Sequence, residues 1–250
     1  MSKVFAVIAF LLIFSFSYCE NLVVAAAANT QFALKEIIRE FEKNYPDIHI
    51  RTVISSSGKL TSQILKGAPY DIFISADMKY PLFLYKRGLS LGKPKVYAYG
   101  TVVLWTAKDI KIKDIFDLKK KYIKKIAVAN PKTAPYGRES IRILKFYNLY
   151  EDVKGKLVYG ESISQTSQYI YRKLVDIGFT AKSIVMAPKM KGKGFWIELD
   201  EKSYNPIKQG AVVLKKAKNL KTAKLFYDFL FSKKARKILK KYGYKVPEGE

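Results

Sequence analysis

The chain has 250 residues, of which 49% are apolar and 14% aromatic, and its formal net charge is +25 at pH 7. This length and composition exclude a disordered or low-complexity protein and allow one large domain or two modest ones. The charge raises the question of nucleic-acid binding, but the lysines are scattered and alternate with aliphatic and aromatic residues. Such spacing favours solvated helix faces, whose positive field attracts small anions.

The first 19 residues have the pattern of a secretory signal. Lys3 precedes an unbroken apolar run over residues 4–14, and small residues follow that run. The run is shorter than the about 20 residues that a membrane span needs. A lipidated Cys19 is an alternative, against which the bulky Tyr18 argues. Cleavage after Ser17 or after Cys19 fits the pattern, and either predicts a periplasmic protein. If Cys19 is removed with the signal, the mature protein has no cysteine, which excludes disulfides, thiolate metal sites and a catalytic cysteine.

Apolar runs and helical patterns alternate along the rest of the chain. The predicted order is strand 22–26, helix 30–44, strand 49–54, helix 58–66, strand 71–75, a long strand 96–106, helix 114–122, strand 125–129, helix 137–147, strand 156–160, helix 164–174, strand 176–180, a short helix from 181, a long strand 207–215 and helices 220–231 and 233–242. This alternation predicts parallel sheets with right-handed crossovers.

The two long strands divide the chain into two similar α/β parts. We expect residues 20–99 together with 204–250 to form lobe 1 and residues 100–203 to form lobe 2, with approximate boundaries. The fold class predicted is α/β, with two lobes joined by a two-segment hinge and a ligand cleft between them.

Four predicted strands end in small polar residues and lead directly into a helix. These junctions lie at residues 23–30, 53–58, 126–137 and 157–164. The first turn of a helix presents unpaired backbone N–H groups and a partial positive charge. Parallel α/β sheets place ligands at the carboxyl ends of their strands, where these junctions lie. The sequence therefore predicts a cleft that binds an oxyanion.

Four short sequence motifs along the chain carry a resemblance to a known family. The run Gly67–Asp77 reads Gly-Ala-Pro-x-Asp-x-Phe-x-Ser-Ala-Asp, and it is accompanied by Ser55–Leu60, Pro135–Gly137 and Tyr242–Tyr244. With these strings the chain resembles the periplasmic molybdate-binding proteins of ABC transporters, from about residue 21 to 247. The resemblance implies the type II periplasmic-binding-protein fold, capture of tetrahedral molybdate or tungstate, and delivery to an ABC permease in the membrane. It also implies a monomer without a cofactor or catalytic activity.

The resemblance assigns ligand-binding roles to four positions. Asn29 follows the first strand, and Ser57 is expected to donate its hydroxyl and its backbone N–H. Tyr136 and Ile163 are expected to donate backbone N–H groups. Some relatives add a tyrosine hydroxyl where this chain has Ala181, so Tyr136 or the Asn29 amide is expected to compensate. The metal is held within its oxyanion, so no residue is expected to ligate it directly.

A shell of neutral donors fits a small dianion on physical grounds. Charge-assisted hydrogen bonds are about twice as strong as neutral ones, and neutral donors avoid the cost of burying lysines. A site with donors alone disfavours hydrogen phosphate, which still carries a proton, and the smaller sulfate is disfavoured by the size of the cavity. Molybdate and tungstate are nearly equal in size, so the sequence does not separate them.

Neighbouring polar residues are given structural roles. Ser55 and Ser56 are interpreted as strand-end or turn residues. Arg138 lies in the first turn of a predicted helix, where a cation opposes the helix dipole, and we expect it in a salt bridge with Glu139 or with the other lobe. Asp77 is expected to cap an element or to bridge the lobes.

Other functions remain open at this stage. The chain could bind another oxyanion, sulfate or phosphate, or it could be an enzyme built on the same fold. Against an enzyme stand the single histidine, His49, and the absence of a nucleophile-elbow or phosphate-loop motif. A basic protein for nucleic acid or membrane surfaces is set aside, because a secreted chain meets little nucleic acid; no nucleic-acid partner is expected.

Overall fold

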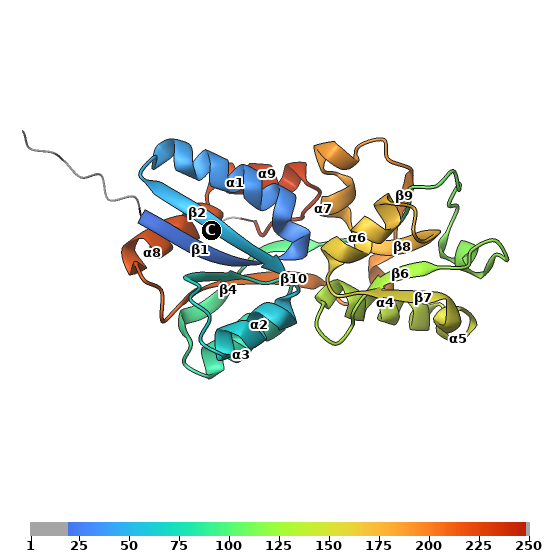
Figure 1. Cartoon of the computed structure of the whole chain (residues 1–250), viewed down its shortest axis with the longest axis horizontal. Helices are drawn as coiled ribbons and strands as arrows, with labels where there is room; N and C mark the ends of the chain where they lie inside the picture. Colours follow the sequence, from blue (N-terminus) through green and yellow to red (C-terminus); the bar gives the residue numbers. More distant parts are fainter. Residues whose placement is uncertain (1–19, 249–250) are drawn as a thin grey trace, which may run out of the picture.

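The computed structural model describes residues 20–248, which form two five-stranded sheets. The first sheet has the order β2-β1-β3-β10-β4 and the second has the order β7-β6-β8-β5-β9. The strands of the first sheet are β1 (Glu20–Ala27), β2 (Ile48–Ser55), β3 (Ile72–Ile74), β4 (Ser90–Gly100) and β10 (Ile207–Leu214). Those of the second are β5 (Val102–Thr106), β6 (Ile126–Ala129), β7 (Leu157–Gly160), β8 (Ile177–Ala181) and β9 (Phe195–Glu198). Figure 1 shows the first sheet on the left and the second on the right.

Both sheets are mixed rather than purely parallel. β1 is parallel to β2 and β3, and β6 is parallel to β7 and β8, as the strand–helix alternation predicts. β10 is antiparallel to β3 and β4, and β5 is antiparallel to β8 and β9. The prediction of parallel sheets is therefore correct only for the three-stranded βαβαβ part of each sheet.

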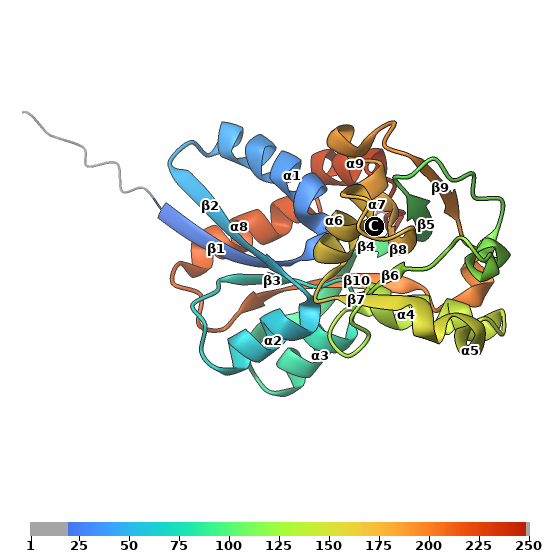
Figure 2. The ribbon, with the colours of Figure 1, turned by 45° about the vertical axis from the view of Figure 1, so that its right-hand side comes forward.

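Helices cover both faces of each sheet. The helices packed around the first sheet are α1 (Gln31–Asn44), α2 (Ser57–Leu65), α3 (Lys79–Lys86), α8 (Leu220–Leu230) and α9 (Lys233–Lys241). Those around the second are α4 (Pro135–Phe146), α5 (Tyr150–Val153), α6 (Ile163–Tyr171) and α7 (Lys182–Val185). Figures 1 and 2 show α6 on one side of β6 and α4 on the other. β5, β6 and β8 are buried along their whole length, which explains their continuous apolar sequences.

Short 3₁₀ turns connect several of these elements. They are η1 (Ala28–Thr30), η2 (Ile115–Lys119), η3 (Lys154–Lys156), η4 (Pro188–Met190) and η5 (Glu201–Ser203). The predicted helix 114–122 is only the 3₁₀ turn η2, and the sequence reading did not identify α3, α5 or β9.

The long strand predicted over 96–106 is divided between the two sheets. β4 ends at Gly100 and β5 begins at Val102, so that Thr101 alone separates the first sheet from the second. Gly100 is required here because a Cβ would clash with the hydroxyl of Tyr136 and with the side chain of Gln209. The chain returns to the first sheet between η5 and β10. The lobe boundaries at 99/100 and 203/204 stay predictions.

The predicted signal segment, residues 1–19, lies outside the described residues. Within residues 20–248, none of the helices combines the length and the apolar character needed to cross a bilayer.

Candidate functional site

The four residues that the sequence assigned to the ligand line one small cavity between the two sheets. Asn29, Ser57, Tyr136 and Ile163 are all at least 96% buried. The other lining residues are Ala27, Ala28, Ser56, Ala76, Ala134 and Pro135, and the empty volume is about 200 Å³. None of these lining side chains carries a charge. The structure thus brings the four positions together in a neutral pocket, while their role toward a ligand stays a prediction.

Three α-helices and one 3₁₀ turn begin at the cavity wall. η1 begins at Ala28, α2 at Ser57, α4 at Pro135 and α6 at Ile163. The first-turn N–H groups of a helix have no partner within the helix, and the aligned peptide dipoles give this end a partial positive charge. The convergence of these starts makes the wall a surface of hydrogen-bond donors with a positive potential.

Ser57 is oriented by a backbone donor. The N–H of Ala76, which follows β3, donates to the Oγ of Ser57 over 2.9 Å. A hydroxyl that accepts one bond retains its own proton for donation. The Ser57 hydroxyl is therefore positioned to act as a donor, while Gly58 N–H is already engaged by Thr133 O at 2.9 Å.

Asn29 does not use its amide as expected. Its Nδ2 donates to Gln209 Oε1 at 2.8 Å and to the hydroxyl of Tyr244 at 2.9 Å. Its Oδ1 is buried without a hydrogen-bond partner among residues 20–248. The backbone carbonyl of Asn29 accepts from Ser183 Oγ and from the Tyr244 hydroxyl, both at 2.9 Å. In this arrangement both protons of the amide that was expected to compensate for Ala181 are engaged by protein groups.

The hydroxyl of Tyr136 is also occupied. It accepts a hydrogen bond from Gln209 Nε2 at 3.3 Å, so the Tyr136 contribution expected at the cavity is its backbone N–H in the first turn of α4. Burial raises the pKa of Tyr136 well above its usual value, and the same cause acts on Tyr97 and Tyr244 nearby. All three hydroxyls therefore keep their protons at neutral pH.

Ser56 lines the cavity, although its sequence context favoured a strand-end or turn residue over a ligand. It is 3% exposed, it lines the cavity, and its Oγ has no hydrogen-bond partner in the described part of the chain. Ser56 is the N-cap of α2, yet its side chain makes no capping hydrogen bond. A serine at this position usually accepts from the first turn, so the sequence alone gives no signal that this hydroxyl remains free.

Charged residues hold the two halves together around the cavity. Arg138 at the start of α4 forms an ion pair with Asp77 after β3, which confirms the predicted salt bridge to the other half of the molecule. Lys59 Nζ in α2 lies 3.0 Å from a carboxylate oxygen of Glu161. We call these two ion pairs the rim pairs. The rim pairs join residues close to cavity-lining positions of the two halves.

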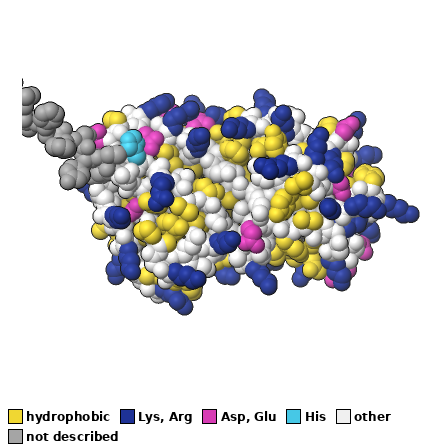
Figure 3. All heavy atoms as spheres, viewed as in Figure 1, with side chains coloured by type: hydrophobic (Ala, Val, Ile, Leu, Met, Phe, Trp, Pro, Cys, Tyr) yellow, Lys and Arg dark blue, Asp and Glu magenta, His cyan; other side chains and the backbone are white. Residues whose placement is uncertain are grey.

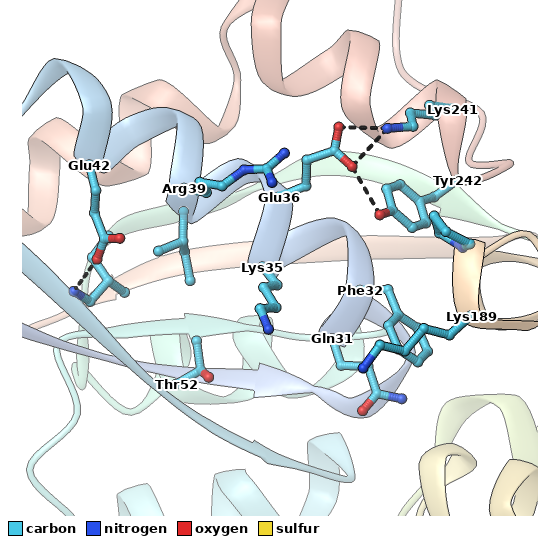
Figure 4. Close-up of a pocket in the computed structure, with 13 residues that line it drawn as sticks. Gln31, Phe32, Lys35, Glu36, Arg39, Glu42, Thr52, Lys189, Lys241 and Tyr242 are labelled. Carbon is cyan, nitrogen blue, oxygen red and sulfur yellow. Dashed lines mark hydrogen bonds and ion pairs between the residues drawn. The ribbon is translucent and has the colours of Figure 1, made fainter.

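A larger groove lies on the surface, beside α1 and β2. Figure 4 shows Lys35, Glu36 and Arg39 of α1 along this groove. Glu36 accepts hydrogen bonds from Lys241 at 2.8 Å and from the Tyr242 hydroxyl at 2.9 Å. The groove is charged where the cavity is neutral, and it contains none of the four predicted residues. It is therefore not the predicted oxyanion site.

The described residues offer no metal centre, and the face seen in Figure 3 carries no concentrated basic patch. Within residues 20–248, no three His, Cys, Asp or Glu side chains are grouped so that they could hold a metal ion. On the face seen in Figure 3, lysine and arginine side chains are spread over both halves of the molecule. This spread agrees with solvated helix faces rather than with one nucleic-acid footprint on that face.

Comparison with known proteins connects this fold to one family. A family model described as bacterial extracellular solute-binding protein matches residues 22–245. The molybdate-binding protein ModA of Azotobacter vinelandii is 38% identical over 224 residues, which cover 88% of each chain. ModA of Rhodobacter capsulatus is 34% identical over 225 residues, covering 90% of this chain and 88% of that one. The solved periplasmic molybdate-binding protein of Azotobacter vinelandii gives a TM-score of 0.86 at 30% identity, covering 91% of this chain and 100% of that chain.

Proposed function

This chain belongs to the bacterial extracellular solute-binding protein family, and on that premise we propose that it captures a tetrahedral molybdate or tungstate ion. The ion would bind in the neutral cavity and be delivered to an ABC permease in the membrane, with the mature protein on the outer side of that membrane. The observation that carries the proposal is the meeting of Asn29, Ser57, Tyr136 and Ile163 at one buried wall of helix starts. The names of the relatives, molybdate-binding proteins, supply the ligand class.

The proposed donor set consists of hydroxyls and backbone N–H groups. Ser57 would donate its hydroxyl and N–H, Tyr136 and Ile163 would donate N–H groups, and Ser56 adds a hydroxyl that has no other partner among the described residues. Ser56 is thereby proposed to supply the side-chain donor that this chain lacks at Ala181. Hydrogen bonds from neutral donors to a dianion are charge-assisted, so several of them offset the loss of the ion's hydration.

Binding and release are proposed to follow hinge motion between the halves. Two segments cross between the sheets, at Thr101 and between η5 and β10, and such crossings are the places where a hinge rotates. The rim pairs and the bond from Gly58 N–H to Thr133 O join the halves when the cavity is closed. We propose a binding protein that acts as a monomer and performs no chemistry on its ligand.

The test is isothermal titration of residues 20–250 with molybdate, tungstate, sulfate and phosphate. We expect tight one-to-one binding of molybdate and tungstate and far weaker binding of sulfate and phosphate. Sulfate is smaller than the ion that the cavity is proposed to fit, and hydrogen phosphate carries a proton for which a donor-only shell has no acceptor. Absence of binding to all four ions would overturn the proposal. Preference for sulfate or phosphate would redirect it to another oxyanion, and turnover of a phosphorylated or sulfated compound would indicate an enzyme.

A further inference from the structure

A fully buried cluster of polar side chains lies directly behind the cavity. Asn29 contacts Gln209 of β10, and Gln209 Oε1 also accepts a hydrogen bond from Tyr97 of β4 at 2.8 Å. On its other side Gln209 Nε2 donates to Tyr136, which belongs to the half of the molecule built on the second sheet. Tyr244 closes the cluster by accepting from Asn29. None of these five residues is more than 4% exposed.

The cluster leaves one side-chain acceptor of a cavity-lining residue unpaired within the described part of the chain, and we infer that this acceptor faces the cavity. Asn29 lines the cavity, and the oxygen of its amide is the side-chain atom without a partner among the described residues. A carbonyl oxygen beside a dianion is repelled by it, and a buried polar atom left unpaired loses its hydration without compensation. The donor-only shell of the proposed function is therefore incomplete in this arrangement of the amide.

A half-turn of the Asn29 amide would exchange its oxygen and nitrogen at nearly constant shape. The nitrogen would then take the place of the unpaired oxygen, but the oxygen would face Gln209 Oε1, which is 2.8 Å from the present nitrogen. Two facing acceptors repel each other, so Asn29 cannot turn alone. A half-turn of Gln209 removes this conflict, because its nitrogen then donates to the Asn29 oxygen. The Tyr244 hydroxyl, which now accepts from Asn29 Nδ2 and donates to the Asn29 carbonyl, would redirect its proton to the turned amide oxygen, while Ser183 Oγ continues to donate to the carbonyl.

Gln209 can turn because its other neighbours are hydroxyls. Tyr97 and Tyr136 contact the two ends of its amide, and a neutral hydroxyl either donates or accepts. Tyr97 has a second acceptor available, the carbonyl of Ser75 at 3.2 Å, to which it can donate while accepting from Gln209. Burial raises the pKa of both tyrosines well above the usual value, so both hydroxyls stay protonated. Each can therefore change between donating and accepting a hydrogen bond.

We propose that Gln209 is a positioning residue, and that oxyanion binding turns the amides of Asn29 and Gln209 together by half a turn; this inference rests on the proposed function. In the turned state Gln209 Nε2 donates to Asn29 Oδ1 and to Tyr97, and Tyr136 donates to Gln209 Oε1. Asn29 Nδ2 then donates to the anion. The unturned state offers an acceptor instead, which suits the proton of hydrogen phosphate, so the orientation of Gln209 also contributes to the choice between oxyanions.

Two substitutions of Gln209 separate orientation from packing. Gln209→Glu, when ionised, presents acceptors only and holds the Asn29 nitrogen away from the ligand, whereas Gln209→Met has similar bulk and imposes no orientation. We expect the molybdate affinity of Gln209→Glu to fall at least about 100-fold and that of Gln209→Met less than about 10-fold. Protonation of the introduced Glu restores a donor, so its affinity should recover as pH falls toward 5.5 more than that of the wild type.

The same pair in the Asn29→Ala background distinguishes positioning from simple repulsion by the Glu charge. If Gln209 acts through Asn29, most of the gap between the Glu and Met variants disappears in that background, whereas direct charge repulsion would preserve it. Equal affinities of Gln209→Glu and Gln209→Met in the Asn29 background, or an unchanged gap without Asn29, would overturn the inference. Thermal melts of every variant establish whether it is folded.

A second measurement uses the unaltered protein. The side-chain amide ¹H–¹⁵N signals of Asn29 and Gln209 are followed by NMR during titration with molybdate. We expect both pairs of signals to shift together and the Asn29 amide protons to exchange more slowly when bound. Calorimetric binding without any change in these signals would overturn the inference and leave the proposed function standing, whereas no calorimetric binding would overturn the proposed function itself.

Discussion

The wall of the cavity is neutral, whereas its rim is built from ion pairs. The wall has no charged side chain and presents hydroxyls and helix starts, while the rim joins the halves through Arg138–Asp77 and Lys59–Glu161. A buried lysine or arginine would attract any anion and would cost several kcal/mol to desolvate. At the rim, opposite charges satisfy one another. The comparison teaches that neutral groups are suited to selecting the ligand and charged groups to holding the halves closed.

The comparison is tested most severely by placing a charge in the wall. Ser57→Asp introduces a carboxylate at a fully buried position beside the proposed dianion. We expect molybdate affinity to fall by about 1,000-fold or more, because two negative charges would share a desolvated site. Calorimetry measures the loss, and Ser62→Asp on the exposed face of α2 is the matched control, expected to bind like the wild type. Equal binding by the two variants would contradict the location of the site.

The free hydroxyl in the wall gives the second largest effect. Ser56→Ala removes a buried hydroxyl that lacks a partner among the described residues. We expect an affinity loss of about 10-fold, the value of one hydrogen bond to a charged group. Stability of the unliganded protein should stay equal or rise, because an unsatisfied polar atom disappears. Titration and thermal melts measure both quantities, and a drop in melting temperature with unchanged affinity would assign Ser56 to the fold alone.

The partly buried rim pair, Arg138–Asp77, should affect the rate of ligand release rather than the preference between oxyanions. Asp77→Asn leaves Arg138 without its carboxylate, and Arg138 Nη1 already lacks a partner among residues 20–248. We expect dissociation of molybdate to accelerate about 3- to 10-fold, while the preference for molybdate over sulfate remains unchanged. Stopped-flow release measures the rate. A changed preference between these ions would show that the rim also selects.

The exposed rim pair should have the smallest effect. Lys59 and Glu161 are both more than half exposed at their side chains, so solvent and salt screen their attraction. We expect Lys59→Ala to change affinity by less than about 3-fold. The difference should vanish at about 1 M salt, at which the Debye length falls to about 3 Å and the attraction between exposed charges is screened. An effect as large as that of Asp77→Asn would mean that Lys59 meets the ligand.

Local sequence patterns located the four strand–helix junctions that meet at the cavity, and the family resemblance selected one residue in each. An apolar run followed by small polar residues and a helix marks the carboxyl end of a strand, and parallel pairing places such ends at one edge. Asn29 and Ser57 follow two strands of the first sheet, and Tyr136 and Ile163 follow two strands of the second. Whether these residues bind the ion stays a prediction.

The features that sequence did not give depend on partners far along the chain. Residues 96–106 are one apolar β-type stretch, and nothing within it indicates that the pairing partner changes at Thr101. The Asn29 amide is directed by Gln209, 180 positions away. The free hydroxyl of Ser56 reflects a capping bond that did not form. Periodicity and propensity contain no information on such distant contacts.

The order of the strands along the chain also determines which sheet can be completed first during synthesis. All strands of the second sheet lie between residues 102 and 198, whereas the first sheet requires β10, which inserts between β3 and β4. Until residue 214 has emerged, β4 has no neighbouring strand in its sheet and both of its edges can pair with other chains. The half of the molecule that begins the chain is therefore the last to be completed, and its strand edges stay open to pairing for longer than those of the half inserted within it.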